Sequence, residues 1–519
     1  MPSIFSNEPL TNFATPENRK AFTDALALVE SRLGTTYPLV IGGREVAPGA
    51  TFDSLNPANP AQRVATFANA GAAEARAALD AAWHAFPAWA EWPAKRKAKL
   101  LFDAAAQMRA RKHEFSAAMV FEVGKPWAEA DGDTAEAIDF LEFYARQALD
   151  LQGGPKPCTQ IPDELSELFY IPLGAGVVIP PWNFPVAIMV GMTGAAIVAG
   201  NTVVLKPSSD SPLVAQMFFD VLRACGLPPG VVNFLPGGGA TAGEELVTHP
   251  RTRFISFTGS KEVGLGIVEK AGRTAQGQIW IKRVIAEMGG KDTMVIDRGV
   301  ELDLAAAAVS AAAFGFSGQK CSACSRAIIH PDVYDEFRDK LLARVAAIRV
   351  GDPRDPATGM GPVVNRASLD KCLSYVEIGK TEGRLIAGGE TPSIDGGYYL
   401  TPTVFDDVKP GARLDQEEIF GPILALIRGE GGIEGMIRVA NATEFGLTGA
   451  IWTNDRMSVE YAKRHFHVGN LYINRKCTGA LVDVHPFGGF NMSGTDSKAG
   501  GRDYLLLFTQ AKSISEKFN

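Results

Sequence analysis

The chain is poor in cysteine, carries no surplus of positive charge and starts without basic residues. Six cysteines among 519 residues are too few for the disulfide framework of a small secreted protein, so we expect a reducing compartment. A formal net charge of −7 provides no excess of Lys and Arg to neutralise a phosphate backbone, which argues against a nucleic-acid binder. Residues 1–18 contain no Lys or Arg, so we expect neither a secretory signal nor a transit peptide. These features predict a cytoplasmic protein that acts on small molecules.

One long uncharged segment, residues 168–205, exceeds the roughly 20 apolar residues that span a bilayer. Its first half is interrupted by Pro172, Pro180, Pro181, Asn183 and Pro185. No continuous helix could satisfy its backbone in lipid there. The segment instead predicts a buried strand at 176–179, a Pro-rich turn, a helix at about 184–199 and a second strand at 202–205. Apolar runs without alternation are typical of a parallel sheet covered on both faces.

Strand-like and helical runs alternate in two regions, residues 174–296 and 303–474. Strands are expected at 176–179, 202–205, 231–234, 254–257 and 283–287, and then at 327–329, 423–427, 449–452 and 470–473. This alternation is the signature of βαβ units. The chain is therefore predicted to be an α/β protein with two doubly wound domains whose sheets are mostly parallel.

The region before the first sheet is mostly helical. Residues 72–149 are rich in Ala, Glu, Arg and Leu at helical spacing, which predicts a layer of helices broken at Pro87, Pro93 and Pro126. A short β segment is expected at residues 37–46, with a turn at its two glycines.

Two strand-to-helix turns could hold the phosphates of a dinucleotide. The glycine-rich turn at 237–242 follows one predicted strand, although a plain flexible turn is an equally good interpretation of it. The second turn, 257–260, ends a strand and opens a helix, where free backbone N–H groups and the Ser260 hydroxyl could bind a pyrophosphate. Two such turns in successive βα units favour a nucleotide site.

The strongest chemical feature surrounds Cys321, in the run FSGQKCSACS at 316–325. Small neighbours permit close approach of a substrate, and a helix N-terminus with Lys320 beside it would favour the nucleophilic thiolate. Three alternatives stay open at this point: Cys321 and Cys324 could be buried structural thiols, a CxxC redox pair or half of a zinc site. Zinc fits poorly, because the seven histidines offer no second half-site, and we expect no metal.

A nucleophilic thiol needs a base, and Glu287 is the candidate. It ends an apolar strand immediately before two glycines that allow close packing against a ligand. Taken alone, it is better interpreted as a strand-end surface charge. Together with a reactive cysteine one domain junction away, a general base is the favoured interpretation.

Several motifs occur together and in one order. They are PWNFP at 181–185, LKPS at 205–208, FTGS at 257–260, EMGGK at 287–291, GQKC at 318–321 and EEIFGP at 417–422. This set resembles the aldehyde dehydrogenase superfamily. FSNEP at 5–9, KCSA at 320–323, TGAL at 478–481, PFGGF at 486–490 and SGT at 493–495 resemble the branch that oxidises the γ-semialdehyde of glutamate in the second step of proline breakdown. The resemblance covers essentially the whole chain.

The resemblance implies a mechanism. Cys321 would attack the aldehyde carbon, the Asn183 amide and the Cys321 backbone N–H would hold the oxyanion, and Glu287 would activate the water that hydrolyses the thioester. It implies NAD as the cofactor, with Lys206 and Glu418 at the ribose hydroxyls, Ser260 at the pyrophosphate and Phe420 beside the nicotinamide ribose. The other implied cofactor residues are Ile179, Pro180, Pro181, Trp182, Ser208, Ser209, Gly238, Gly243, Phe257, Gly259, Val263, Met288 and Gly289.

The resemblance also implies a substrate site. Ser322, Gly479 and Ala480 would anchor the α-carboxylate, with Lys320 in the same site, and Phe184 and Phe487 would flank the aliphatic stem. An ordinary small-residue turn is the alternative for Gly479 and Ala480. Ser209 stands where many NAD-preferring relatives carry a Glu, so the preference for NAD over NADP rests on the rest of the match.

The resemblance further implies how the chain is divided and what it binds. The segments are an arm with the helical part of the NAD-binding domain (1–154), an oligomerisation flap (155–172), a Rossmann-like core (173–290), a catalytic domain (291–485) and a return to the first domain with an oligomerisation tail (486–519). We expect a homodimer or dimer-based oligomer, with a separate proline dehydrogenase as a transient partner. The alternatives are another semialdehyde dehydrogenase, such as one for succinate semialdehyde, and a catalytically silent relative.

Overall fold

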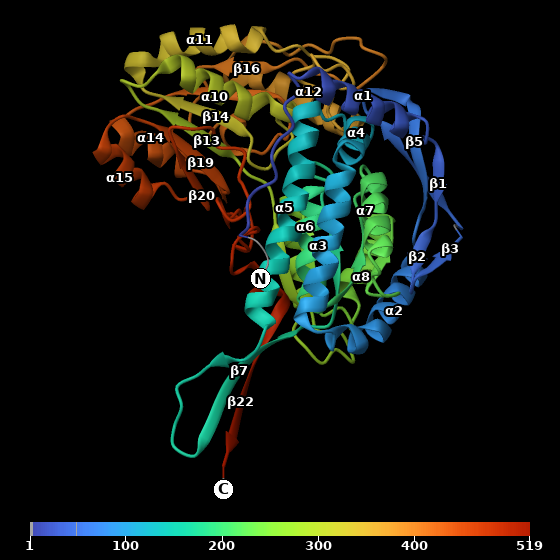
Figure 1. Cartoon of the computed structure of the whole chain (residues 1–519). Helices are drawn as coiled ribbons and strands as arrows, with labels where there is room; N and C mark the ends of the chain where they lie inside the picture. The colour runs from blue at the N-terminus through green and yellow to red at the C-terminus, as the bar shows by residue number, and fades with distance from the viewer. Residues whose placement is uncertain (1–3, 48, 519) are drawn as a thin grey trace.

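The structure is a computed structural model that describes residues 4–47 and 49–518. Predictions that fall on residues 1–3, 48 and 519, within the first and last predicted segments, lie outside the described residues. Within the described ranges the strands form two large sheets of seven strands each, which belong to two α/β bodies (Figure 1). The predicted fold class, two doubly wound domains with mostly parallel sheets and a small β flap, is confirmed.

The first sheet has the order β12-β11-β8-β9-β10-β2-β3. Its strands are β8 (Ala175–Ile179), β9 (Thr202–Leu205), β10 (Val232–Phe234), β11 (Phe254–Thr258), β12 (Arg283–Glu287), β2 (Leu39–Ile41) and β3 (Arg44–Val46). The strands from β12 to β10 are parallel, and the predicted positions of these five are confirmed to within a residue. The antiparallel strands β2 and β3 form the sheet edge and turn at Gly42 and Gly43.

The second sheet has the order β15-β16-β17-β14-β13-β19-β20 and is parallel except for β15 at its edge. Its strands are β13 (Asp292–Ile296), β14 (Cys324–Ile329), β15 (Arg384–Ala387), β16 (Thr403–Asp406), β17 (Ile423–Arg428), β19 (Thr448–Trp452) and β20 (Asn470–Ile473). Helices α10 (Leu302–Phe314), α11 (Tyr334–Ala346), α12 (Arg366–Glu382), α13 (Arg413–Gln416), α14 (Gly432–Asn441) and α15 (Arg456–His465) accompany it. The four strands predicted for this region are confirmed.

Helices cover both faces of the first sheet. The helices of this domain are α1 (Pro16–Glu30), α2 (Ala72–Ala90), α3 (Ala94–Ala110), α4 (Lys112–Val123), α5 (Trp127–Gln152), α6 (Ala187–Val198), α7 (Pro212–Ala224), α8 (Glu244–Thr248) and α9 (Lys261–Gly272), of which α1 packs on α4. Neighbouring residues of β9 show the arrangement, because Val203 packs in the cluster with α3, α5, α6 and α7, whereas Val204 packs in the cluster with α2 and α8. Such two-sided burial explains the continuous apolar runs in these strands.

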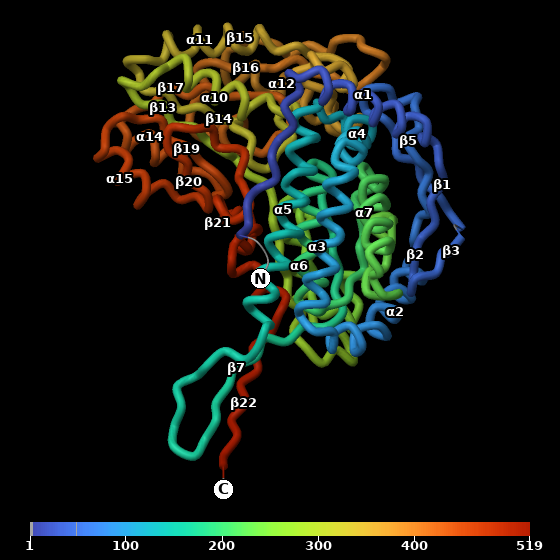
Figure 2. The backbone as a smooth tube through the Cα atoms, viewed as in Figure 1, coloured from blue at the N-terminus to red at the C-terminus, as the bar shows by residue number. Residues whose placement is uncertain are grey.

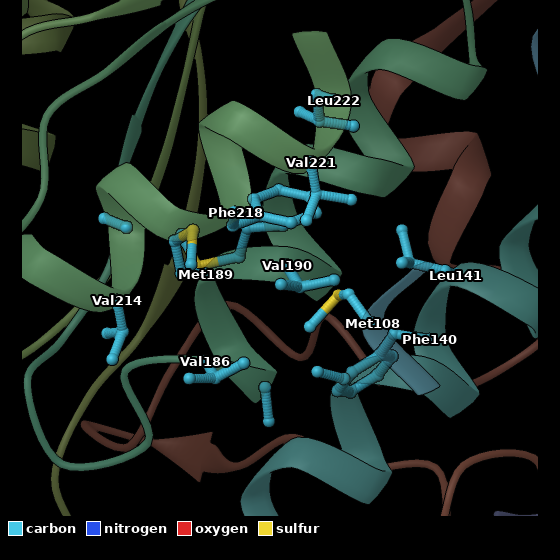
Figure 3. Close-up of a cluster of buried hydrophobic side chains, with 14 of the residues drawn as sticks. Met108, Phe140, Leu141, Val186, Met189, Val190, Val214, Phe218, Val221 and Leu222 are labelled. Atoms are coloured by element: carbon cyan, nitrogen blue, oxygen red, sulfur yellow. The ribbon is translucent and has the colours of Figure 1, made fainter. Parts of the chain in front are cut away.

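The core under α6 and α7 is shown in Figure 3. Met108 from α3 and Phe140 from α5 meet Val190 from α6 and Phe218 from α7, and all four side chains are buried. The helices therefore pack into one hydrophobic layer that fixes the end of α6 nearest the candidate site.

The predicted helix breaks are correct at two of three prolines. Pro93 and Pro126 immediately precede α3 and α5. The break at Pro87 is wrong, because α2 continues through this residue to Ala90. Pro87 lies in the last turn, where its missing N–H removes one helical hydrogen bond, and the buried Trp89 holds the turn in place.

A hairpin that the sequence analysis did not predict packs against α4 and α7. Strands β4 (Thr51–Asn56) and β5 (Asn59–Ala68) are antiparallel, and β1 (Thr35–Tyr37) adds to β5. The predicted β segment at 37–46 is thus divided between this sheet and the first large sheet.

A small β flap projects from the body (Figures 1 and 2). It has the order β22-β7-β6, with β6 (Lys156–Pro157), β7 (Glu164–Pro172) and β22 (Thr509–Lys517). Strands β7 and β22 are paired from Pro172 with Thr509 to Glu164 with Lys517. Where the chain enters β22, the Arg283 guanidinium donates to the carbonyls of Leu506, Leu507 and Thr509, and the Asn201 amide donates to that of Phe508.

The uncharged segment 168–205 contains the end of β7, then β8, α6 and β9. The predicted strand, turn, helix and strand are confirmed, and residues 168–172 belong to the flap. Among residues 4–47 and 49–518, no helix is both long enough and apolar enough to cross a membrane.

Candidate active site

Three segments bring Asn183, Glu287 and Cys321 to one place. Asn183 lies in the turn between β8 and α6, Glu287 is the last residue of β12, and Cys321 lies in the turn before β14. The Asn183 Nδ2 donates to the carbonyl of Gln319 at 3.1 Å, which fixes the amide against the turn that carries Cys321. Such a position at the carboxyl ends of parallel strands is where ligands bind in open α/β sheets.

The Cys321 turn is held in an unusual backbone conformation. The short helix η2 (Gly315–Gly318) contains Phe316 at φ 50° and Ser317 at φ 56°, both in the left-handed region. At Gly318, a Cβ atom would lie 2.3 Å from the carbonyl oxygen of Gly421, so this position requires glycine. The Ser317 hydroxyl donates to the carbonyl of Gly361 at 2.8 Å, which anchors the turn.

The prediction of a helix N-terminus at Cys321 is wrong. A helical turn ends before Cys321 and a strand follows it, and Lys320 points away to form an ion pair with Glu129 at 2.7 Å. Burial, together with the nearby carboxyl groups of Asp292 and Glu287, raises the pKa of the Cys321 thiol well above its usual value. The resting residue is therefore a neutral thiol that must lose its proton to a base.

Glu287 has the properties of such a base. Burial raises the pKa of Glu287 to about 7, while hydrogen bonds from Ser497 lower it. The Ser497 hydroxyl donates to Glu287 Oε1 at 2.5 Å. Glu287 Oε2 is buried and has no hydrogen-bond partner among the described residues. A carboxyl group that titrates near neutral pH is suited to general-base work.

The candidate cofactor residues surround the carboxyl ends of β8, β9 and β11. Lys206 follows β9, and its Nζ donates to the carbonyls of Gly237 and Pro207 at 3.1 and 3.2 Å. Burial lowers the pKa of Lys206 to about 8. Gly243, in the wide helical turn η1 (Gly239–Gly243), lies beside the Lys206 stem, because a Cβ there would be 3.7 Å from it. The glycine-rich turn and Lys206 thus share one site.

The other half of this region comes from the second domain. Glu418 accepts a hydrogen bond from the Gly290 N–H at 2.9 Å, and its side chain lies so close to Gly289 that a Cβ would be 2.2 Å from Oε2. Phe420 packs edge-on against Trp182, with 5.5 Å between ring centroids. The other predicted cofactor residues lie at or after the carboxyl ends of β8, β9, β10, β11 and β12 and on the first turn of α9: Ile179, Pro180, Pro181, Ser208, Ser209, Gly238, Phe257, Gly259, Ser260, Val263 and Met288.

The residues present fit a dinucleotide. Lys206 supplies a buried ammonium donor, Glu418 supplies a carboxylate acceptor, and ribose hydroxyls can satisfy both. Ser260 caps α9 by accepting from the Val263 N–H, and this helix end provides free backbone donors for a phosphate.

Apart from Phe184, the candidate substrate residues lie on the Cys321 turn and on loops of the second domain and the C-terminal part. The Cys477 thiol donates to the carbonyl of Ser322 at 3.4 Å, which joins the nucleophile turn to the loop that carries Gly479 and Ala480. Gly479 has φ 78°, and its carbonyl accepts from Arg475 at 3.0 Å. Phe487 lies in the next loop, where its backbone pairs with Ala499.

The sequence analysis missed an acidic stripe on α5. Glu129, Asp133 and Glu136 lie one helical turn apart on one face of α5. Burial raises the pKa of Glu136 to about 8, and its charge acts on Cys321. The sequence does show three acidic residues at helical spacing in an Ala-rich region, and this pattern could have predicted the stripe. The spacing alone does not show which part of the protein the stripe faces.

Lys125 was missed as well. Its ammonium forms an ion pair with Asp133 at 2.5 Å, and both side chains are fully buried. The Nζ also lies 4.0 Å from the ring centroid of Phe184 and 4.8 Å from that of Phe316. Asp133 in turn accepts from the Ala187 N–H at 2.6 Å, at the start of α6. The pair therefore connects a predicted substrate residue to the helix layer.

Replacing Lys125 by methionine should destabilise the protein by about 3 to 5 kcal/mol, because Asp133 would be left buried without its partner. The Phe184 ring, a predicted substrate contact, would also lose its cation contact, so the KM for the substrate should rise. Thermal unfolding and steady-state kinetics measure both effects. The matched variant K20M, in an exposed ion pair with Asp24, should leave both unchanged. Equal melting temperatures for K125M and K20M would contradict the assignment.

Comparison with known proteins gives consistent matches. The model of the aldehyde dehydrogenase family matches residues 45–514. A 1-pyrroline-5-carboxylate dehydrogenase from Geobacillus sp. (strain WCH70) is 54% identical over 514 residues, which cover 99% of each chain. The crystal structure of a 1-pyrroline-5-carboxylate dehydrogenase from Thermus with bound NAD is 50% identical and superposes with a TM-score of 0.98 over 99% of each chain.

A longer protein is also similar. Proline utilization A from Bdellovibrio bacteriovorus is 42% identical, with a TM-score of 0.97, and the match covers 100% of this chain but 54% of that one.

Proposed function

The chain belongs to the aldehyde dehydrogenase family, and on that premise we propose that it oxidises L-glutamate γ-semialdehyde to L-glutamate with reduction of NAD+. One observation carries the chemistry: the Asn183 amide, the Glu287 carboxyl group and the Cys321 thiol meet at the carboxyl ends of the first sheet. The relatives that match from end to end bear the name of this activity.

The residues act in the following order. Glu287 Oε2 takes the proton of the Cys321 thiol, and the thiolate forms a bond to the aldehyde carbon. The oxyanion that results is held by the Asn183 amide and the Cys321 backbone N–H. When NAD+ is bound, it accepts hydride from this carbon. Glu287 then releases the Cys321 proton to solvent and, as a carboxylate again, takes a proton from water while the water oxygen bonds to the thioester carbon. The carbon–sulfur bond breaks, Cys321 leaves as a thiolate and regains its proton from Glu287, and the acid product loses its own proton to leave as the carboxylate.

The cofactor and substrate are placed by the surrounding residues. Lys206 and Glu418 bind ribose hydroxyls, and Ser260 binds the pyrophosphate at the start of α9. Ser322, Gly479 and Ala480 hold the α-carboxylate, while Phe184 and Phe487 flank the aliphatic stem. The contact between Cys477 and Ser322 supports this proposal, because it places the anchor loop beside the nucleophile turn.

The substrate assignment is tested by ranking aldehydes. With L-glutamate γ-semialdehyde, kcat/KM should exceed that with succinate or methylmalonate semialdehyde by about 100-fold, because groups that would bind the amino acid stay unpaired with the analogues. NADH formation measures each rate. Equal values for the glutamate and succinate aldehydes would identify the chain as another semialdehyde dehydrogenase. S322A should lower kcat/KM for the glutamate aldehyde alone.

We also propose an oligomeric state, a cellular compartment and a partner enzyme. Segments 155–172 and 486–519 contribute the flap, and its β7–β22 pair would join two copies into a homodimer or a dimer-based oligomer. We propose a cytoplasmic enzyme that receives its substrate from a separate proline dehydrogenase. The match to 54% of a longer proline utilization protein supports such a partner. The proposed division of the chain is 1–154, 155–172, 173–290, 291–485 and 486–519.

A further inference from the structure

The segment from Ser493 to Lys498 connects both domains beside Glu287. It lies against β12, because the Met288 N–H donates to Ser493 and the Thr495 N–H donates to Ala286. It is tied to the second domain as well, since the Ser493 hydroxyl accepts from the Gly446 N–H and Lys498 donates to the carbonyls of residues 469 and 488. We call residues 493–498 the return segment.

The return segment and two glycines form a close cradle around Glu287. A Cβ atom at Gly494 would lie 3.1 Å from Glu287 Oε1, and one at Gly488 would lie 3.2 Å from the same oxygen. Ser497, which is 3% exposed, reaches Oε1 through its hydroxyl at 2.5 Å and its N–H at 3.4 Å. A side chain at either glycine would compete with the carboxyl group for this space.

The two oxygens of Glu287 therefore differ. Oε1 is enclosed and accepts both hydrogen bonds from Ser497, whereas Oε2 is buried without a partner. A buried carboxylate oxygen without a partner is costly to maintain, and taking a proton lowers that cost because it neutralises the charge.

We propose that Ser497 is a positioning residue that pins Glu287 Oε1 and leaves Oε2 as the oxygen that takes protons from Cys321 and from water. This inference rests on the proposed function. Ser497 contacts the base and acts on the reaction through it. The return segment thereby determines which oxygen faces the reacting groups.

The titratable groups that act on Glu287 come from three elements. Lys498 lies on the return segment, Cys321 on the nucleophile turn, and Tyr504 on the short helix η4 (Tyr504–Phe508). Burial raises the pKa values of Cys321 and Tyr504, so both stay neutral near pH 7. Burial lowers the pKa of Lys498, whose ammonium is held by two carbonyls. A change in the apparent pKa of kcat that follows removal of the Ser497 hydroxyl is therefore assigned to Glu287, which Ser497 contacts, and not to Glu136 or Lys206, whose pKa values are about 8.

The experiment compares kcat between pH 6 and about 9.5 for wild type and S497A. In wild type, kcat should rise with pH through an apparent pKa near 7, because the deprotonated carboxylate is the active form. In S497A the apparent pKa should move up by about 0.5 to 1 unit, since a hydrogen bond that favours the carboxylate is lost. At pH 7, kcat should fall about two- to fivefold, and the loss should disappear near pH 9 with KM unchanged.

Ser493 provides the matched control. S493A removes a buried hydroxyl contact from the same segment without touching Glu287, so its apparent pKa should equal that of wild type. An S497A profile that falls equally at all pH values, or a shift of equal size in S493A, would overturn the positioning role. Absence of NADH formation by wild type itself would instead overturn the proposed function.

Discussion

Replacing Cys321 by alanine should abolish turnover, with NADH formation falling by about 10⁴-fold or more. The thiol forms the first covalent bond that the proposed mechanism makes to the aldehyde carbon, and alanine offers no nucleophile in its place. Without this bond the carbon stays trigonal and does not carry the oxyanion from which hydride departs. The assay is the NADH absorbance change with L-glutamate γ-semialdehyde as substrate.

The matched control is C324A, three residues along the chain. Cys324 is buried at the start of β14, and its thiol donates to the carbonyl of Arg326 at 3.3 Å. This is a structural contact, so C324A should retain turnover. Substantial NADH production by C321A would disprove the mechanism. Equal losses in both variants would show that the run around Cys321 acts through folding or as a thiol pair.

Replacing Glu287 by glutamine should permit a first hydride transfer and then stop the cycle at the thioester. Glutamine has nearly the same shape but cannot take a proton from water, so steady-state turnover should fall by about 10² to 10⁴-fold. Loss of the base should also slow the first step, because the Cys321 proton has lost its acceptor. Rapid mixing should show a burst of NADH close to one per active site, and mass spectrometry of the protein should show the acyl adduct.

The control for this substitution is E301Q. Glu301 is an exposed carboxylate before α10 in the second domain, and its side chain makes no capping contact with that helix. This variant should show neither a burst nor a slower steady state relative to wild type. An unchanged steady-state rate in E287Q would remove Glu287 from the role of base.

The parallel sheets were predictable because their strands are buried on both faces. Val203 and Val204 point to opposite clusters, so both must be apolar, and the strand stands out in the sequence. Strands β4 and β5 gave no such signal. They are joined by Pro57 and lie partly exposed beside polar residues, which is typical of a loop.

The candidate site was predictable where motifs lie on strand ends. Asn183 follows β8, Glu287 ends β12 and Cys321 precedes β14, and all three strands are buried or half-buried. The arrangement of the strands therefore brings the three residues together. The electrostatics of Cys321 were not predictable, because they depend on distant segments. The left-handed residues Phe316 and Ser317 turn the chain away from a helix, and Lys320 is drawn to Glu129 on α5. Local sequence carries neither piece of information.

The hydrogen bonds that Arg283 and Asn201 donate to residues 506–509 affect how a mechanical load passes through the molecule. The chain runs from the return segment through η4 into the flap, so a pull on the flap would otherwise travel along the backbone towards Glu287. The Arg283 guanidinium and the Asn201 amide donate to four successive carbonyls, residues 506–509, at the end of η4 and the first residue of β22. Tension applied at the C-terminal end, by a fusion partner or an immobilising surface, is therefore borne by the first sheet. Part of that load enters β12, the strand that begins at Arg283 and ends at Glu287.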